Sequence, residues 1–235
     1  MTEHANEPRR LTRRESLLRF AGVAAAVGGG AAWKLDQEAG AAGPLAVSTG
    51  VVACVLAPEL TEGPYYVDGE KLRRDITEGK PGMPLQLSLK VVNASTCKVV
   101  KNAAVDIWHC DASGEYSGAV ANHPGTNFLR GIQRTNAKGI ATFRTIYPGF
   151  YPGRAVHVHV RVYYAGSVVH TGQLFFPTAI TSAVYSSAPY RNHGTTPDTS
   201  NAADSIYRNG GNKGLLKLTK SGAGYTGAIA MGVYL

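Results

Sequence analysis

The sequence predicts an all-β protein: a single β-sandwich with long loops, preceded by an N-terminal export signal. Three observations support this fold class. The 235 residues include 28 glycines and 12 prolines, and only 17% of the residues are charged. Short segments of alternating apolar and polar residues recur between turn signals. Strong helical periodicity is missing after the N-terminal segment, and the chain is long enough for one large β domain.

The expected strands are the segments in which apolar and polar residues alternate. They span residues 85–93, 104–110, 140–146, 155–164, 168–176 and 225–235. We expect the first two to form a hairpin. A second hairpin is expected between the strands at 155–164 and 168–176, across Ala165-Gly-Ser. Residues 181–214 are polar and are expected to be irregular loops.

Residues 1–45 are predicted to be an export signal and linker, and residues 46–235 the sandwich domain. Arg13 and Arg14 precede a weakly apolar, alanine- and glycine-rich stretch, as in twin-arginine signals. That stretch is short and interrupted by glycines, so we expect no stable membrane span; a disordered basic tail is the alternative. Cleavage is expected within residues 38–46. The mature protein is therefore expected in the periplasm, at the cell surface or outside the cell.

The charge pattern argues against nucleic acid as a partner. The formal net charge is +8, but the basic residues are scattered, and no basic run with interleaved aromatics follows residue 20. Nucleic-acid-binding proteins instead gather Lys and Arg on one face. A mildly positive mature protein would attract anionic aromatic acids to its surface.

The chain has three cysteines, Cys54, Cys97 and Cys110, and export favours a disulfide. Cys97 lies near the tip of the expected first hairpin and Cys110 at the far end of its second strand. Bridged Cα atoms must lie within ~7 Å of each other, so this pairing is disfavoured. We expect Cys54 to pair with one of the other two, which leaves one free thiol. The sequence contains no CxxC pair, so a structural zinc site is not expected.

The most informative segment is Tyr151-Pro-Gly-Arg-Ala-Val-His-Val-His159. Successive side chains of a strand point to opposite faces, so His157 and His159 project from the same side. The valines between and beyond them line the other side, which is typical of a core face. Two imidazoles one pleat apart can coordinate a single metal ion. Surface histidines without a metal are the alternative interpretation of this pair.

Several separated motifs surround this pair in a recognisable order. They are Glu62-Gly-Pro-Tyr-Tyr66, Asp106-Ile-Trp-His-Cys-Asp-Ala-Ser-Gly-Glu-Tyr116, Leu129-Arg-Gly-Ile-Gln133, Pro148-Gly-Phe-Tyr151 and Arg154-Ala-Val-His157-Val-His159. Together they resemble the intradiol ring-cleavage dioxygenases, the family of catechol 1,2-dioxygenases and protocatechuate 3,4-dioxygenases. The resemblance covers most of residues 58–178.

The resemblance implies a mononuclear non-haem Fe(III) ion held by Tyr66, Tyr151, His157 and His159. Tyr66 is preferred to Tyr65 because the family ligand is taken as the second residue after proline in Glu-Gly-Pro-x-Tyr. Tyr65 is expected to pack or to line the pocket. The ligand types suit the metal, since anionic phenolate oxygens are hard ligands that favour Fe(III) over Fe(II).

The resemblance also implies the reaction, in which O2 opens a catechol ring between its two hydroxylated carbons and gives a cis,cis-muconate. Tyr151 would take a proton from the substrate, and Arg154 would stabilise negative charge that develops on the ring. Gln173 is expected to hydrogen-bond near the metal or near Arg154. Trp108 and Tyr116 are expected to be core and pocket wall.

The same residues are compatible with two other functions. The first is a non-catalytic β-sandwich binding module that has kept the fold. The second is a zinc metallohydrolase that uses His157 and His159, which would leave the tyrosines unexplained. The family often has Pro-Ala where this chain has Ala155-Val156, directly beside Arg154. The sequence does not identify the physiological catechol, and it leaves the oligomeric state open, a homodimer included.

Overall fold

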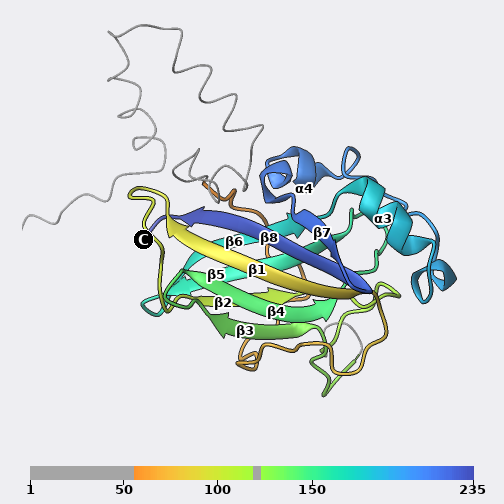
Figure 1. The fold of residues 1–235 in the computed structure, drawn as a ribbon, viewed down its shortest axis with the longest axis horizontal. Helices are drawn as coiled ribbons and strands as arrows, with labels where there is room; N and C mark the ends of the chain where they lie inside the picture. The colour runs from red at the N-terminus through yellow and green to blue at the C-terminus, as the bar shows by residue number, and fades with distance from the viewer. Residues whose placement is uncertain (1–55, 119–122) are drawn as a thin grey trace, which may run out of the picture. The chain divides into compact units, whose positions relative to one another are not determined.

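The structure, a computed structural model, describes residues 56–118 and 123–235. The predicted export signal lies outside these residues. Eight strands form two four-stranded sheets (Figure 1). Sheet A has the order β4 (Ile140–Ile146), β1 (Pro84–Asn93), β8 (Gly224–Val233) and β7 (Lys217–Ser221). Sheet B has the order β3 (Arg130–Arg134), β2 (Ala104–Trp108), β5 (His157–Tyr164) and β6 (Ser167–Phe175).

Neighbouring strands are antiparallel except β1 and β8, which run parallel. The predicted hairpin between β5 and β6 is confirmed. Its two turn residues, Ala165 and Gly166, have φ values of 49° and 84°, the conformation that matches the twist of paired strands. The predicted hairpin between β1 and β2 is wrong, because these strands lie in different sheets. Strand alternation shows which face is buried, but it does not identify the partner strand.

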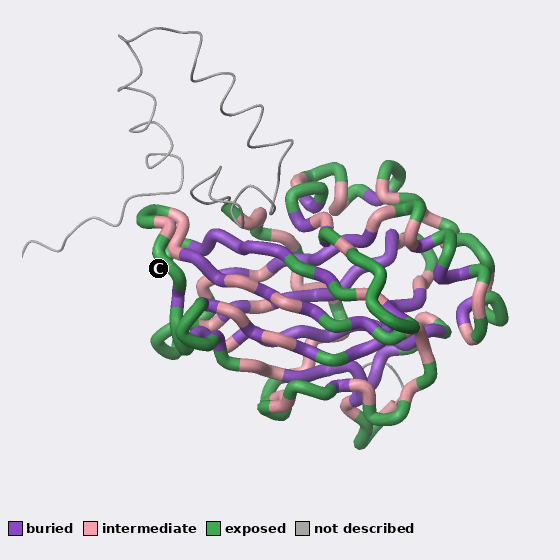
Figure 2. Tube along the Cα trace, in the orientation of Figure 1, coloured by how far each residue is buried: buried purple, intermediate pink, exposed green. Residues whose placement is uncertain are grey.

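The core lies between the two sheets, as in other sandwiches. Leu87 and Leu89 of β1 and Val158 and Val160 of β5 are fully buried, and they belong to one continuous apolar cluster. Figure 2 shows buried residues following each central strand. The valine side of β5 is therefore the core face that the sequence predicts. The opposite side of β5, which carries the histidines, faces the loops.

The sequence missed two short strands and two short helices. The strands β3 and β7 each lie at the edge of a sheet and are rich in Arg and Lys, as edge strands often are. Their polar sequences hide the alternation. The helices α3 (Thr178–Tyr185) and α4 (Ser205–Arg208) and the 3₁₀ turns η2 (Tyr190–Asn192) and η3 (Gly211–Gly214) interrupt the region expected to be irregular. Among the described residues, no helix is long and apolar enough to cross a membrane.

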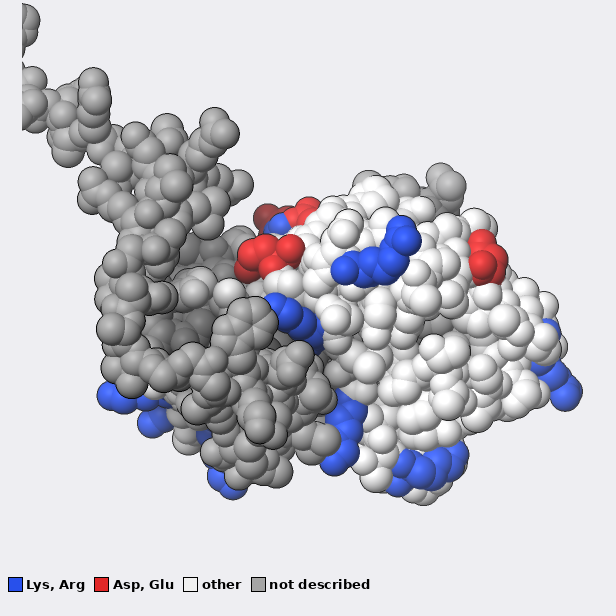
Figure 3. Space-filling view, turned by 90° about the horizontal axis from the view of Figure 1, so that it is seen from above, with Lys and Arg blue, Asp and Glu red and all other residues white. Residues whose placement is uncertain are grey.

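The cysteines agree with the expectation that one thiol stays free. Cys97 is disulfide-bonded, whereas Cys110 is a free and buried thiol. The third cysteine, Cys54, lies outside the described residues. Basic side chains are scattered over the face drawn in Figure 3, in keeping with the scattered basic residues of the sequence.

Candidate metal centre

Two histidines form the base of the site on the loop-facing side of β5. His157 and His159 are 3% and 1% exposed, so both imidazoles are shielded from water. Trp108 of β2 is paired with His159 in the strand register. Its ring stacks on the imidazole with centroids 5.0 Å apart and planes 6° apart. The strand pairing thus fixes the orientation of His159.

The hydrogen bonds of His157 select a tautomer that can bind a metal. Its Nδ1 lies 2.6 Å from the carbonyl oxygen of Ala155, which can only accept, so Nδ1 carries the proton. The lone pair of Nε2 is therefore free, and this atom lies 3.0 Å from Nε2 of His159. Burial lowers the pKa of His157 to about 3 and the pKa of His159 well below its usual value. Both rings are neutral at physiological pH, which is the form that ligates metals.

Tyr151 completes one side of the site. Its hydroxyl lies 3.1 Å from Nε2 of His157. Burial raises the pKa of Tyr151 to about 12, while the contact of its hydroxyl with Tyr116 and the positive charge of Arg154 oppose this rise. The phenol is thus neutral in the metal-free protein, and a cation at the histidine pair would favour its phenolate.

Tyr116 is the second tyrosine that the fold brings to the histidines. Tyr116 is 2% exposed. Its ring centroid lies 5.6 Å from that of Tyr151 and 6.1 Å from that of His159. The hydroxyl is buried and close enough to Tyr151 to affect the pKa of that phenol, but it makes no hydrogen bond of good geometry among the described residues, a costly state for a polar group. Burial raises the pKa of Tyr116 well above its usual value. From the sequence, this residue is expected only to line the pocket.

Two close backbone contacts bring Tyr116 and Tyr151 together. A Cβ on Gly114 would lie 2.2 Å from the carbonyl oxygen of Phe150, and a Cβ on Gly149 would lie 2.3 Å from that of Asp111. Only glycine allows these approaches. The turn that begins at Asp111 therefore packs directly against the segment that leads into Tyr151. This turn follows β2, whose neighbour in the sheet is the histidine strand; that neighbour relation is the signal the sequence alone does not contain.

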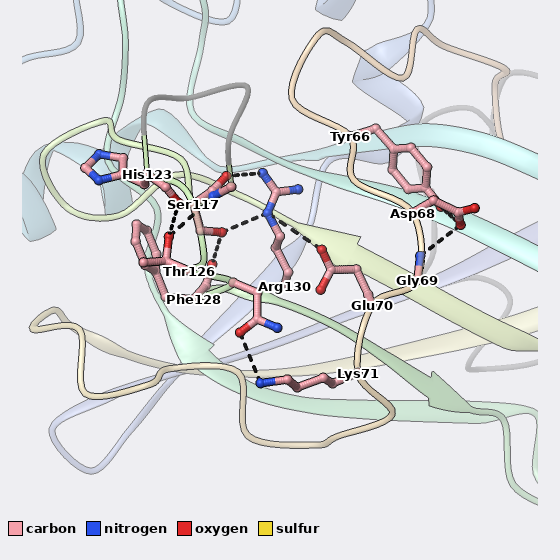
Figure 4. Close-up of polar contacts among 12 residues, drawn as sticks. Tyr66, Asp68, Gly69, Glu70, Lys71, Ser117, His123, Thr126, Phe128 and Arg130 are labelled. Atoms are coloured by element: carbon pink, nitrogen blue, oxygen red, sulfur yellow. Dashed lines mark hydrogen bonds and ion pairs between the residues drawn. The ribbon is translucent and has the colours of Figure 1, made fainter.

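Tyr66, expected to be a ligand, lies elsewhere. Its hydroxyl is 2.6 Å from the hydroxyl of Tyr163 and donates to Asp68 at 3.2 Å, and Figure 4 shows its ring beside Asp68. Tyr163 is four residues after His159 on β5, or ~13 Å along an extended strand. The guanidinium of Arg161 lies 4.2 Å from the Tyr66 ring. This placement corrects the expectation for Tyr66, which the structure does not bring to the histidine pair.

Its neighbour Tyr65 points to the site instead. The Tyr65 ring stacks on that of Tyr116 with centroids 4.4 Å apart, and it contacts Tyr151 edge-on at 6.0 Å. Tyr65 is thus a packing residue of the tyrosine cluster, the role that the sequence analysis expected for it.

Arg154 and Gln173 lie together, as the sequence predicts. Nη2 of Arg154 donates to Oε1 of Gln173 at 2.5 Å. Nε of Arg154 donates to the carboxylate of Asp204 at 2.9 Å, a partner that the sequence analysis missed because it lies fifty residues away in the region expected to be irregular. Nε2 of Gln173 donates to the carbonyl of Thr61 at 2.9 Å.

A second buried polar cluster lies beyond Tyr66. Asp106 is 1% exposed, and neither carboxylate oxygen has a hydrogen-bond partner in the part of the chain that the structure describes. Burial, helped by the negative charge of Glu70, raises the pKa of Asp106 to about 8. Nε of Arg130 lies 3.8 Å from Glu70, a contact drawn in Figure 4. This cluster carries formal charges, whereas the histidine site is neutral.

The donor set at the histidine pair fits a hard, highly charged cation. Tyr116 presents a buried oxygen without a partner, Tyr151 presents a second oxygen beside His157, and the two Nε2 atoms face each other. Two phenolate oxygens and two neutral imidazoles form a ligand set suited to ferric iron. The high pKa values of the phenols mean that they would bind as phenolates only against a strong positive charge.

Comparison with known proteins identifies the family. The sequence model of a family described as Dioxygenase matches residues 61–182, just over half of the 235 residues. Catechol 1,2-dioxygenase 2 of Acinetobacter lwoffii is 35% identical over 100 residues, which cover 40% of this chain and 35% of that protein. The protocatechuate 3,4-dioxygenase beta chain of Burkholderia cepacia is 31% identical over 125 residues, which cover 47% and 52%.

A solved structure shows the same fold. The intradiol ring-cleavage dioxygenase from Tetranychus urticae superposes with a TM-score of 0.73 at 34% identity, covering 77% of this chain and 95% of that chain. The chain spans about a third to a half of the length of the curated relatives it matches. It belongs to the intradiol ring-cleavage dioxygenase family, and its two-sheet sandwich is the fold of that family.

Proposed function

We propose that this protein is an Fe(III)-dependent dioxygenase that opens catechol rings between the two hydroxylated carbons and yields cis,cis-muconate-type products. Membership of the family supports the reaction class. The observation that carries the proposal is the convergence of Tyr116, Tyr151, His157 and His159, with the Tyr116 hydroxyl buried and unpartnered among the described residues. These four residues are the proposed iron ligands, with Tyr116 in place of Tyr66.

When bound, ferric iron would bind the catechol oxygens and make the ring reactive toward O2. The chain's own residues would supply positioning and proton transfer. The Tyr151 oxygen, which lies beside His157, would accept a proton from the substrate as a phenolate and become a neutral hydroxyl. A phenolate is a suitable base for a catechol proton because their pKa values are similar. Tyr65 and Trp108 pack around the site and exclude water from it.

Arg154 is proposed to stabilise negative charge that develops on the ring. Two of its three guanidinium nitrogens bind Asp204 and Gln173, and Nη1 takes no part in these bonds. A fixed cation in a partly buried site stabilises a developing anion without having to reorganise. The contact between Gln173 and Arg154 supports the proposed role of Gln173 as the residue that holds this guanidinium.

A colour and product experiment tests the function. The purified protein, loaded with iron, should show a visible tyrosinate-to-Fe(III) charge-transfer band that shifts when catechol is added without oxygen. With ¹⁸O2, mass spectrometry should find both labelled atoms in one muconate product. A colourless protein that binds zinc at the histidine pair would instead support the metallohydrolase, and a metal-free protein that binds catechol unchanged would support a binding module.

We further propose export by the twin-arginine-like segment at Arg13 and Arg14, which lies outside the described residues, and catechols met outside the cytoplasm, such as plant-derived ones, as substrates. Cell fractionation with an Arg13→Lys/Arg14→Lys double variant tests the location. Accumulation of both forms outside the cytoplasm would contradict the role of the paired arginines. Activity restricted to catechols that arise only inside cells would contradict the substrate proposal.

A further inference from the structure

Asp204 is a buried carboxylate that connects the loop region to the site. It is the residue before α4, and its side chain is fully buried. Oδ1 accepts hydrogen bonds from the backbone N–H groups of Ile206 and Tyr207, at 2.8 and 3.0 Å. Oδ2 accepts from Nε of Arg154 at 2.9 Å and from the backbone N–H of Ala155 at 2.8 Å. One oxygen thus caps the helix, and the other holds the segment that enters the histidine strand.

The hydrogen bonds of Asp204 continue through Arg154 to a third segment. Arg154 donates to Gln173, and Gln173 donates to the backbone of Thr61, in the loop that carries Tyr65. Because Asp204 and Gln173 occupy Nε and Nη2, the plane of the guanidinium is fixed, and Nη1 is the nitrogen left outside these bonds. Arg154 is 18% exposed at its side chain, so water competes little with these contacts.

Asp204 supplies the negative charge of this pair. Burial raises the pKa of Asp204, but hydrogen bonds from Tyr207, Ala155 and Arg154 bring it below its usual value. Asp204 is therefore an anion across the physiological range. It partly balances the guanidinium, which would otherwise act on the site at full strength.

We propose that Asp204 is a positioning residue for Arg154, which orients the guanidinium so that its Nη1 edge can stabilise charge on the substrate ring. This inference rests on the proposed function. A helix cap alone would need only Oδ1, and neutral Asn or Ser caps a helix as well as Asp does. The use of Oδ2 for Arg154 and Ala155 is what separates positioning from capping.

The test uses the full-length, iron-loaded protein and the variants Asp204→Asn, Asp204→Ser, Arg154→Ala and the double variant Asp204→Asn/Arg154→Ala. Both Asp204 variants keep a helix-capping oxygen but lose the anion that pairs with Arg154. We expect iron content, charge-transfer colour and the Kd of anaerobic 4-nitrocatechol to stay within about threefold, while kcat falls about 10- to 100-fold. Adding Asp204→Asn to Arg154→Ala should cost less than about twofold, because there is no guanidinium left to position.

Asp198→Asn is the matched control. Asp198 lies six residues before Asp204 but is exposed. It accepts from the backbone N–H of Gly153 at 3.2 Å, and an amide oxygen can still accept this bond. Its kcat should stay within about twofold of the wild type.

Other results would contradict either the positioning role of Asp204 or the proposed function. If Asp204→Asn and Asp204→Ser lose kcat only in proportion to lost iron or lost folded protein, Asp204 is a structural cap. The same conclusion follows if Asp204→Asn lowers kcat equally with and without Arg154. An active wild type whose kcat is unchanged in both variants overturns the positioning role alone. A wild type that neither binds iron with colour nor cleaves catechol overturns the proposed function, and the positioning role with it.

Discussion

The loop-facing side of β5 has different surroundings at the start of the strand, here called the histidine end, and at its other end, here called the charged end. His157 and His159 at its start are neutral, buried and close to each other. Arg161 and Tyr163 at its end lie on the same side of the strand, but they are engaged with neighbours. Arg161 forms an ion pair with Glu62, and Tyr163 shares a hydrogen bond with a tyrosine of the covering loop. The histidine end presents neutral ligand atoms that face each other, whereas the charged end combines paired groups with unpartnered buried atoms among the described residues, such as Nε of Arg161 and both carboxylate oxygens of Asp106.

The contrast shows that strand alternation selects a face but not a function. Tyr65 and Tyr66 are adjacent in the sequence, yet Tyr65 packs on the tyrosine cluster at the histidine end and Tyr66 bonds at the charged end. What separates the ends is the set of loops above them. The turn after β2 brings Tyr116 over the histidines, whereas residues 62–70 bring Glu62 to Arg161 and Glu70 to Arg130.

The largest expected effect is the loss of iron binding when a tyrosine hydroxyl is removed at the histidine end but not at the charged end. Tyr116→Phe should lose charge-transfer colour, and iron affinity should fall by more than about 100-fold, since even groups behind metal ligands are worth 10- to 100-fold. Tyr66→Phe, the matched control with the same atom removed, should keep colour and keep kcat/KM within about threefold. Iron analysis and visible spectra check both. The opposite result would restore Tyr66 as the ligand and reject the placement argued for Tyr116.

A pH-dependent effect is expected at the charged end. The pKa of Asp106 is about 8 in the folded protein, because of burial first and Glu70 second, against about 3.9 in unfolded chains. Between these values the unfolded state releases a proton that the folded state keeps, so stability falls as pH rises from about 4 to 8. The slope is up to about 1.4 kcal/mol per pH unit.

Asp106→Asn removes this titration and should flatten the curve, so that the variant gains stability over the wild type as pH approaches 8. Urea unfolding from pH 5 to pH 8.5 measures the difference. Parallel curves for the two proteins would mean that Asp106 is ionised in the fold and that its carboxylate has a partner.

A smaller effect is expected from Arg161→Met, which keeps the apolar stem of the side chain but removes its charged guanidinium. Glu62 would lose its ion-pair partner and Tyr66 the cation over its ring. Loss of a charged hydrogen-bonding group in a partly exposed site costs about 2 kcal/mol. Urea unfolding should show this loss while the iron colour is unchanged. A loss of colour would show that the two ends are coupled.

The smallest effect concerns the stability of Tyr66→Phe. The variant loses the hydrogen bond to Tyr163 and the longer, exposed one to Asp68, and it keeps the ring contact with Trp108. A net hydrogen bond is worth about 1 kcal/mol and the exposed one adds little, so the free energy of unfolding should fall by about 1 kcal/mol. Tyr163→Phe should have a similar effect, and the double variant should cost less than the sum of the two. Additive losses would show that the two hydroxyls do not interact.

Much of the fold could be predicted because buried alternation is a local property. The strands β1, β4, β5, β6 and β8 agree with their expected ranges to within about two residues at each end. The edge strands β3 and β7 could not be found, because charged edge residues hide the alternation. The pairing of β1 was missed as well: its partners β4 and β8 are distant in sequence, and only packing selects them.

The candidate site likewise contains residues that could be predicted from the sequence and residues that could not. His157 and His159 were predictable from a two-residue spacing, and Arg154 and Gln173 from the motif and its resemblance. Tyr116 was not predicted as a ligand, because only the pairing of β2 with β5 places its turn beside the histidine strand. Asp204 was missed because the sequence around a helix-capping carboxylate in a polar loop does not indicate which distant residue it binds.

The sequence by itself determined the sandwich class, the family and the face on which the two histidines stand, because alternation and motif order are written along the chain. Only the tertiary structure decided which tyrosines meet those histidines and which carboxylate holds Arg154. The physical reason is close packing: contacts such as those at Gly114 and Gly149 fix how loops cross, and these crossings depend on the whole fold.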